Sequence, residues 1–478
     1  MELTALNLAE AKAGLVAGNF TAAELVQAYT SRIGKLDDKL GTFLHLATES
    51  VLRQAQDDVG TGALVGIPFA HKDLICTPDM PTTAASKILE NYQPTHAATV
   101  HERLADAGAV CLGKLNLDEF ALGSSTENSA YKTTKNPWDT SRVPGGTSGG
   151  SAAAVAADLC VFATGTDTGG SIRQPASFCG VTGLKVTYGR VSRYGVVAAA
   201  SSLDTVGFLT KTVRDAAELL GIAAGKDPRD ATTGDQPVPN YTAELRTDLK
   251  GLKVGVPKEY FIDGLNPEVE AAIRAGIEKM RELGAEIVEV SLPHTDAALA
   301  AYYIINPSEV STNMARYDGI RFGSAGQGED LVETYFDART KGFGDEVKRR
   351  IMLGTFALSA GYADQFYKKA IQARTLVKQD FDNVFEEVDV LATPVAPTTA
   401  FKIGEKSNDP IEMYLADIFT IPASLAGVPG ISVPAGFDST GLPIGMQLLA
   451  GQWEEAKLLG AAHAFQMATD HHTKKPTL

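Results

Sequence analysis

Hydrophobic residues recur along this chain in two patterns, at helical spacing in some segments and in short unbroken runs in others. An amphipathic segment follows Thr21, and Glu24 lies three positions later, so a capping box and a helix are predicted there. The apolar run 65–70 predicts a short buried strand that brings Lys72 to its end. The same reasoning predicts further elements, which are helices over 99–107 and 148–159, strands over 109–112, 252–257 and 287–290, and a helix from Pro267 onward.

Strands and helices alternate along the chain, which predicts an α/β fold with a central mixed β-sheet flanked by helices on both faces. We expect one large domain over 1–478, with a mainly helical N-terminal part over 1–60. A core with the lysine and serine motifs should span 61–225, and the second half of the sheet 252–478. Residues 225–251 are rich in Asp, Thr, Pro and Gly, so we expect a polar surface connection between the halves.

The charge balance and the cysteines restrict the class of protein. The chain has 43 Lys and Arg against 58 Asp and Glu, a net charge of −15, which argues against it making the main phosphate contacts to a nucleic acid. The four cysteines form no CxxC pair, which favours buried free thiols over zinc ligands. No secretory signal and no membrane-spanning apolar run is present in the sequence, so we expect a soluble, cytoplasmic protein.

Two clusters of glycine and hydroxyl residues, at 144–151 and 165–173, contain almost no charge. Glycine costs conformational entropy, so such a density is useful where the backbone approaches another group closely or adopts positive φ. A serine at the end of such a loop has its hydroxyl beside free backbone N–H groups. That arrangement indicates acyl transfer, with a nucleophile next to donors for an oxyanion.

The base for such a nucleophile is not an obvious histidine, because none of the eight lies in the glycine clusters. A Ser-His-Asp triad stays open, without support from the spacing. His71 and Lys72 are neighbours on the predicted strand, so only one of them can face a given site. A desolvated Lys72 would have a lowered pKa and could act as a neutral base, although a lysine reaching solvent is the simpler interpretation by itself. Asp167 and Arg173 flank Ser171 and suggest an ion pair that fixes the loop.

Three segments of the chain carry a resemblance to a known family. They run over 67–73, 145–151 and 165–180, and their order and spacing are similar to those of the amidase signature family, over essentially the whole chain. The resemblance implies a single large amidase-signature domain and a triad of a serine, a second serine on a cis peptide, and a lysine. It implies that Ser171 is the acylated nucleophile and that Lys72 is the base.

The bridging hydroxyl of that triad lies 24 positions before the nucleophile, where this chain has Thr147 instead of the family's serine. Threonine keeps the hydroxyl that would relay the proton but adds a methyl group. Ser148 is the neighbouring candidate for the same role. The resemblance also implies that Thr168, Gly169 and Gly170 supply the N–H groups of an oxyanion hole.

Further segments resemble one branch of that family, the glutamine-hydrolysing subunits of tRNA-dependent amidotransferases; these segments are 123–131, 135–139, 187–193, 315–319, 343–350 and 413–417. This resemblance implies that Arg350 and Asp417 hold the α-carboxylate and α-ammonium groups of glutamine, together with Tyr302. A planar guanidinium suits a carboxylate. Without the resemblance, Arg350 would be interpreted as a charge on a helix surface, because Lys348 and Arg349 adjoin it.

The resemblance further implies that ammonia passes through an internal tunnel to a partner subunit, which activates tRNA-bound glutamate or aspartate with ATP and Mg²⁺. The implied partners are the B and C subunits of a heterotrimer. The B subunit would contact the tRNA, and no cofactor or metal is expected in this chain. Two alternatives are a free-standing amidase acting on a small amide and a catalytically impaired scaffold with Thr147 as the lesion.

Overall fold

The computed structural model describes residues 2–47, 62–407 and 409–478. Its sheet consists of β1 (Phe43–Leu46), β2 (Pro68–Lys72), β3 (Val110–Leu115), β4 (Phe162–Asp167), β5 (Thr182–Lys185), β6 (Thr205–Thr210), β7 (Lys253–Pro257), β8 (Glu286–Val290), β9 (Val390–Pro394), β10 (Gly430–Phe437) and β11 (Pro443–Ala450). These eleven strands are ordered β1-β3-β2-β4-β6-β5-β10-β11-β9-β7-β8. Parallel pairs β3–β2–β4 and β9–β7–β8 lie on either side of an antiparallel centre, so the sheet is mixed.

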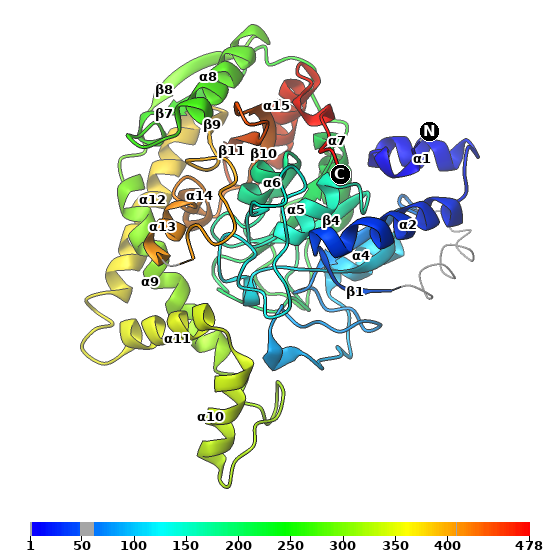
Figure 1. The fold of residues 1–478 in the computed structure, drawn as a ribbon. Coiled ribbons are helices and arrows are strands. Elements are labelled where there is room, and N and C mark those ends of the chain that lie inside the picture. Colours follow the sequence, from blue (N-terminus) through cyan, green and yellow to red (C-terminus); the bar gives the residue numbers. More distant parts are fainter. Residues whose placement is uncertain (1, 48–61, 408) are drawn as a thin grey trace.

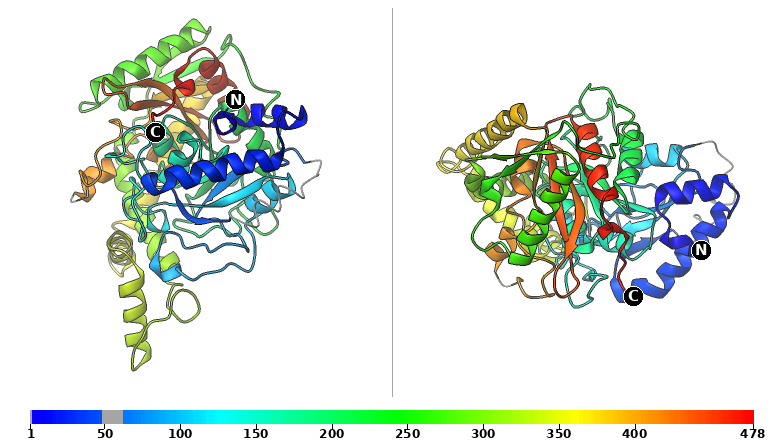
Figure 2. Two further views of the ribbon diagram at one scale, coloured as in Figure 1. Left: turned by 45° about the vertical axis from the view of Figure 1, so that its right-hand side comes forward. Right: turned by 90° about the horizontal axis from the view of Figure 1, so that it is seen from above.

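Helices cover both faces of this sheet, which confirms the predicted α/β class (Figures 1 and 2). The helices are α1 (Leu8–Val16), α2 (Ala22–Leu40), α4 (Thr99–Asp106), α5 (Gly149–Ala156), α6 (Arg173–Cys179), α7 (Val213–Ala223), α8 (Pro267–Glu282), α9 (Thr295–Met314), α10 (Leu331–Gly342), α11 (Asp345–Leu358), α12 (Tyr367–Glu387), α13 (Pro410–Leu415), α14 (Ile421–Ala426) and α15 (Glu455–Met467). Short 3-10 turns are η1 (Leu3–Ala5), η2 (Lys87–Leu89), η3 (Glu119–Ala121), η4 (Lys258–Tyr260) and η5 (His471–Thr473). Helix α10 extends away from the sheet at the bottom of Figure 1.

Elements with clear end signals agree with the sequence. Thr21 and Glu24 form both hydrogen bonds of the predicted capping box, and the helices predicted from 99 and 267 are α4 and α8. The predicted strand 65–70 is shifted to β2, because Gly66 adopts φ of 73° and turns the chain before the strand begins. Lys72 is therefore the last residue within the strand rather than a residue beyond it.

The predicted helix 148–159 is also shorter than expected, since α5 ends at Ala156. Asp158, two residues further on, has φ of 58°, a left-handed conformation that a continuing helix does not allow. The strand predicted over 109–112 extends to Leu115 as β3, whereas the strands predicted near 252 and 287 are β7 and β8 almost as expected.

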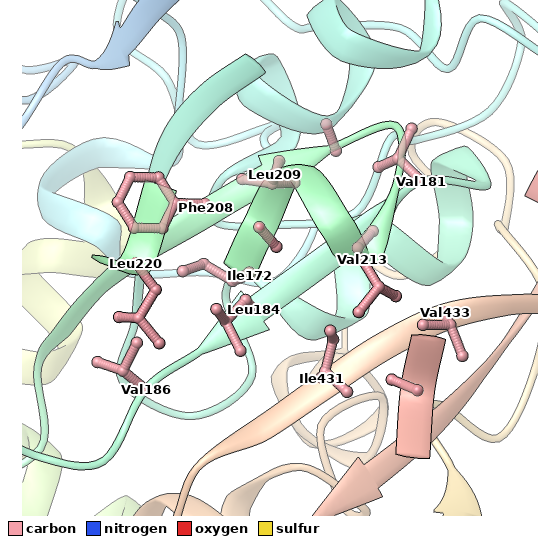
Figure 3. Packing of buried hydrophobic residues seen from close by; sticks show 14 of the residues in the cluster. Ile172, Val181, Leu184, Val186, Phe208, Leu209, Val213, Leu220, Ile431 and Val433 are labelled. Atoms are coloured by element: carbon pink, nitrogen blue, oxygen red, sulfur yellow. The ribbon is translucent and has the colours of Figure 1, made fainter. Parts of the chain in front are cut away.

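Glycines in neighbouring strands create room for the residue that follows Ser171. Gly165 of β4 lies opposite Gly207 of β6, and a side chain added at either position would lie 2.9 Å from an atom of Ile172. Figure 3 shows Ile172 within the apolar cluster that β5 and β6 form with α7 and β10. The apolar side chain of Ile172 is thus held against the sheet, and this fixes the backbone at Ser171.

We predict that Gly207→Ala destabilises the protein by about 3 kcal/mol, because the new methyl group would overlap the carbonyl oxygen of Leu184 and press on Ile172. The measurement is the free energy of unfolding from urea denaturation. Gly221→Ala is the matched control, since Gly221 lies in helix α7 and an added methyl group there would have no atom within 4 Å apart from the backbone of its own helix. That control should stabilise the protein by about 0.5–1 kcal/mol. Equal effects of the two substitutions would contradict the packing described above.

Two further predictions concern the interior and the helices. The four cysteines are all buried and unpaired, which confirms free thiols: Cys76, Cys111, Cys160 and Cys179. Among the residues that the structure describes, none of the helices combines the length and the apolar character needed to cross a bilayer.

Candidate active site

The alternation of side chains along β2 separates two polar residues. His71 lies on one side, where its ring nitrogens are 2.9 Å from Oγ1 of Thr164 and 3.0 Å from Nδ1 of His101. Lys72 points to the other side, toward the glycine-rich loops. The prediction that only one of the two can face a given site is confirmed, and the residue on the side of the loops is the lysine.

Lys72 is completely buried, so the alternative in which its amine reaches solvent is wrong. Its Nζ lies 2.7 Å from Oγ1 of Thr147, 2.9 Å from Oγ of Ser148 and 2.9 Å from Oγ1 of Thr166. Burial lowers the pKa of Lys72 to about 7, and the effect is partly offset by three carboxylates, those of Asp118, Asp167 and Asp204. A substantial fraction of this amine is therefore neutral near pH 7.

The two candidate bridging hydroxyls both lie on the loop that leads into α5. The peptide bond between Gly146 and Thr147 is cis, and both Thr147 and Ser148 are fully buried. The backbone N–H of Ser148 donates to the carbonyl oxygen of Ser171 at 3.1 Å, so the two glycine-rich loops are bound to each other at this point. The structure therefore brings Lys72, Thr147, Ser148 and Ser171 together.

An ion pair spans the turn that contains Ser171. Arg173 contacts both carboxylate oxygens of Asp167 at 3.0 Å, and Asp167 also accepts the backbone N–H of Ile172 at 3.2 Å. Burial alone would raise the pKa of Asp167, but the Arg173 guanidinium outweighs it and lowers the pKa below its usual value. Both side chains are fully buried, and this geometry fits the interpretation of a pair that fixes the loop.

Two residues from distant segments hold the backbone of the predicted oxyanion loop. The Thr420 hydroxyl donates to the carbonyl oxygen of Gly169 at 2.6 Å. The Tyr302 hydroxyl lies so close to Gly169 that an added methyl group there would be 2.7 Å from it. At Gly170, φ of 142° and the nearby Thr420 side chain together exclude any other residue.

Sequence reasoning missed several residues of this site. Thr166 contacts Lys72, and the sequence feature that could have identified it is the alternation of polar residues along β4. Asp204 was also missed, and its carboxylate accepts a hydrogen bond from the hydroxyl of Thr168 at 2.6 Å. Asp118 lies directly against Gly146, and burial raises the pKa of Asp118 to about 6. No local pattern marks Thr420 or Asp118, because their contacts come from segments far apart in the chain.

Arg350 lies on the inner face of α11 and is 3% exposed, so the interpretation as a surface charge is wrong. Its Nε lies 2.8 Å from the Glu346 carboxylate, and its Nη1 donates to Oδ1 of Asn306 at 2.8 Å. The guanidinium carbon also lies 5.3 Å and 5.5 Å from the ring centres of Tyr303 and Tyr414. These contacts hold the guanidinium rigidly in a buried position.

Asp417 and Tyr302 lie in the same buried region. Asp417 accepts a hydrogen bond from the hydroxyl of Ser124, and burial raises the pKa of Asp417 to about 7, although Arg350 acts in the opposite direction. The Tyr302 hydroxyl accepts from Nδ2 of Asn306 at 3.4 Å, so Asn306 connects Tyr302 to Arg350. An anchored cation and a buried carboxyl group together suit a zwitterionic ligand such as a free amino acid.

Comparisons with known proteins show the family to which the chain belongs. The family model described as Amidase matches residues 24–459, and the chain belongs to this family, as its resemblance to the amidase signature family indicated. A Chloroflexus aggregans protein, named as the A subunit of glutamyl-tRNA(Gln) amidotransferase, is 55% identical over 484 residues, covering 100% of this chain and 99% of the relative. A protein of the same name from Microcystis aeruginosa is 55% identical over 464 residues, covering 96% of each chain. The crystal structure of the protein with that name from Thermotoga maritima superimposes with a TM-score of 0.82 at 42% identity, covering 98% of this chain and 95% of that one.

Proposed function

We propose that this chain is the glutaminase subunit of a glutamyl-tRNA(Gln) amidotransferase. The observation that carries the proposal is the buried amine of Lys72, which contacts the Thr147 hydroxyl at 2.7 Å beside the Ser171 loop. An amine with a pKa of about 7 can take a proton at neutral pH. Two relatives that are 55% identical over 100% and 96% of this chain are named as the A subunit of that enzyme.

In the first half-reaction, neutral Lys72 accepts the proton of the Thr147 hydroxyl while Thr147 accepts the proton of Ser171. The Ser171 oxygen then attacks the side-chain amide carbon of glutamine. The negative charge that develops on the amide oxygen is stabilised by the backbone N–H groups of Thr168, Gly169 and Gly170. The proton returns through the same hydroxyl to the leaving nitrogen, and ammonia departs from a glutamyl ester on Ser171.

In the second half-reaction, water attacks the ester carbonyl and gives up its proton through the Thr147 hydroxyl to Lys72. Lys72 then returns the proton through Thr147 to the Ser171 oxygen as the ester bond breaks, so glutamate leaves and the Ser171 hydroxyl is restored. The amine of Lys72 and the hydroxyl of Thr147 are buried and lie within hydrogen-bond distance of each other, so the same pair can serve both steps in this proposal.

Arg350 and Asp417 select the substrate in this proposal. The guanidinium of Arg350 binds the α-carboxylate of glutamine, and ionised Asp417 binds its α-ammonium group, with Tyr302 beside them. Arg350 is positioned before the ligand arrives, because Glu346 and Asn306 already engage its Nε and Nη1. Such preorganisation reduces the entropy lost on binding.

The released ammonia passes in this proposal through an internal tunnel to a partner subunit, which amidates Glu-tRNA(Gln), Asp-tRNA(Asn) or both. ATP and Mg²⁺ act in that partner, and the complex is a heterotrimer with B and C subunits. The B subunit makes most of the tRNA contacts, in keeping with the net charge of −15 on this chain.

The two alternatives from the sequence are less well supported. A free-standing amidase is not favoured, because relatives that are 55% identical over the full length carry the name of an amidotransferase subunit. An impaired scaffold would require that Thr147 cannot relay a proton. The Thr147 hydroxyl, however, lies within hydrogen-bond distance of Lys72, and Thr147 is the residue that follows the cis peptide bond.

The proposed relay predicts opposite outcomes for two substitutions at one position. Thr147→Val keeps the shape but removes the hydroxyl, and we expect glutamine-dependent ammonia release by the assembled complex to fall about 10²- to 10³-fold. Thr147→Ser should stay within about tenfold of the natural protein. Ser148→Ala is the matched control and should have a small effect. If Ser148→Ala abolished activity while Thr147→Val did not, the relay would run through Ser148 instead.

We also predict that kcat/KM for glutamine rises with pH through about 7. Below that pH, Lys72 is protonated and cannot accept a proton, and Asp417 is protonated and cannot bind an ammonium group. When two groups must lose a proton, kcat/KM falls more steeply on the acidic side of its pH profile than when one group must do so. In Asp417→Asn, which retains only the Lys72 ionisation, this fall should become shallower, as a pH series of initial rates would show. A pH-independent kcat/KM between pH 6 and about 8 would contradict the assignment of both groups.

A further inference from the structure

Helix α11, which carries Arg350, begins at a residue that has no side chain to cap it. Gly344 is the N-cap residue, and its backbone N–H donates at 2.8 Å to Oε2 of Glu119, a residue 225 positions earlier. In a capping box the corresponding carboxylate comes from the third residue of the helix itself. Here it comes from Glu119 in η3, and it lies at the positive end of the helix dipole.

Glu119 is 2% exposed, and its second oxygen is also engaged. The hydroxyl of Ser86 donates to Oε1 of Glu119, and the same hydroxyl lies 3.1 Å from the carbonyl oxygen of Gly342, the last residue of α10. Both oxygens of the carboxyl group are thus used to hold the turn between α10 and α11. Burial raises the pKa of Glu119 to about 7, while the contacts with Ser86 and Gly344 act in the opposite direction.

The residue before Glu119 is fastened to the catalytic loops. Asp118 accepts the backbone N–H groups of Thr126 at 2.8 Å and Asn128 at 3.1 Å, and its carboxylate leaves no room for a side chain at Gly146. The next residue, Phe120, has φ of 51°, a conformation that a bulky residue adopts only when its surroundings hold it there. Two adjacent acidic residues therefore contact the cis-peptide loop on one side and the start of α11 on the other.

On α11, Arg350 lies about two turns beyond this anchored start, on the face that contacts α9. An added methyl group at Gly354 would collide with the backbone of Pro307, so the two helices are in direct backbone contact further along. From these contacts we infer that Glu119 is a positioning residue that sets helix α11, and with it Arg350, relative to Ser171. It thereby determines the preference for amides that carry an α-carboxylate. The inference rests on the proposed function, in which Arg350 binds that carboxylate.

The test compares two substrates on the assembled complex, glutamine and 4-aminobutanamide, which is glutamine without its α-carboxylate. In Glu119→Ala we expect kcat/KM for glutamine to fall about tenfold, mostly through KM, because a charge-assisted hydrogen bond to the helix start is lost. The value for 4-aminobutanamide should change less than about threefold. Glu119→Gln is the conservative control. It offers an oxygen to Gly344 and an N–H to Ser86, so both substrates should stay within about threefold of the natural protein.

A second variant tests the same contact without removing the carboxyl group. Gly344→Ala places a methyl group 2.5 Å from Oε2 of Glu119 and should produce the same glutamine-selective loss. If Glu119→Ala does not fold, the kinetics of Gly344→Ala decide whether this contact positions α11. Equal losses on both substrates in the variants that fold, or no loss on either, would overturn the inference. The proposed function fails in a different way, namely if the natural protein does not prefer glutamine to 4-aminobutanamide.

Discussion

Replacing Lys72 with methionine is expected to lower kcat for glutamine hydrolysis by about 10³- to 10⁴-fold. The reason is that, among the described residues, Lys72 alone has an amine in contact with the hydroxyls of Thr147 and Ser148, and methionine removes it. Methionine is apolar and similar in length to lysine, and position 72 is fully buried, so the fold should tolerate the change. The measurement is glutamine-dependent ammonia release by the assembled complex, with binding of glutamine measured separately. We expect binding to change little, since Lys72 does not contact the groups proposed to hold the α-carbon substituents.

Lys185 provides a matched control for this experiment. It is also fully buried, and burial likewise lowers the pKa of Lys185 to about 7. Its amine donates to the carbonyl oxygens of Val428 at 2.8 Å and Val186 at 3.2 Å rather than to hydroxyl groups. Lys185→Met should therefore reduce stability but leave kcat of the folded enzyme within about tenfold. Comparable kcat values in the two variants would show that Lys72 acts only structurally.

Replacing Arg350 with alanine is expected to raise KM for glutamine by about 10²- to 10³-fold, because the variant lacks the buried, preorganised guanidinium that we propose as the partner of the substrate carboxylate. The loss should be confined to substrates with an α-carboxylate. 4-Aminobutanamide cannot use the guanidinium, so its kcat/KM should change less than about threefold. Steady-state kinetics with both substrates on the same complex measures the difference.

Arg349→Ala is the control, because Arg349 is adjacent on α11 but its side chain is 42% exposed and pairs with Glu346 near the surface. It should alter KM for glutamine less than about threefold. Unchanged glutamine kinetics in Arg350→Ala would instead favour a free-standing amidase whose substrate lacks an α-carboxylate. Equal effects of the two substitutions would point to a general disturbance of the helix.

The elements that the sequence predicted well are those with local end signals. The capping box at Thr21 and the Asn266-Pro267 start of α8 depend on neighbouring residues only, and both helices begin where expected. The shifts at β2 and α5 arise from positive φ at Gly66 and Asp158, and only the glycine is a residue type that marks such a turn. The order of the strands depends on contacts between distant segments, and periodicity alone does not reveal it.

Among the residues of the candidate site, those in local motifs could be predicted from the sequence, and those that act through distant contacts could not. Lys72, Thr147 and Ser171 stand in compact motifs, and the structure brings the segments that carry them together. The burial of Lys72 could not be predicted from its place at the end of an apolar run, because a lysine can equally reach solvent there. Thr420 contacts Gly169, Asn306 contacts Arg350, and Glu119 contacts the start of α11, and no local pattern in the sequence marks these three residues. Their contribution is visible only in three dimensions.

The most direct test of the central claim is covalent labelling with 6-diazo-5-oxo-norleucine, a glutamine-shaped electrophile that alkylates an activated nucleophile. Mass spectrometry of peptides from the assembled complex should find the label on Ser171, at a rate that excess glutamine suppresses and that Lys72→Met abolishes. Labelling of Ser148 or Thr147 in place of Ser171, or labelling that is as fast without the amine, would contradict a neutral lysine that activates Ser171 through a hydroxyl.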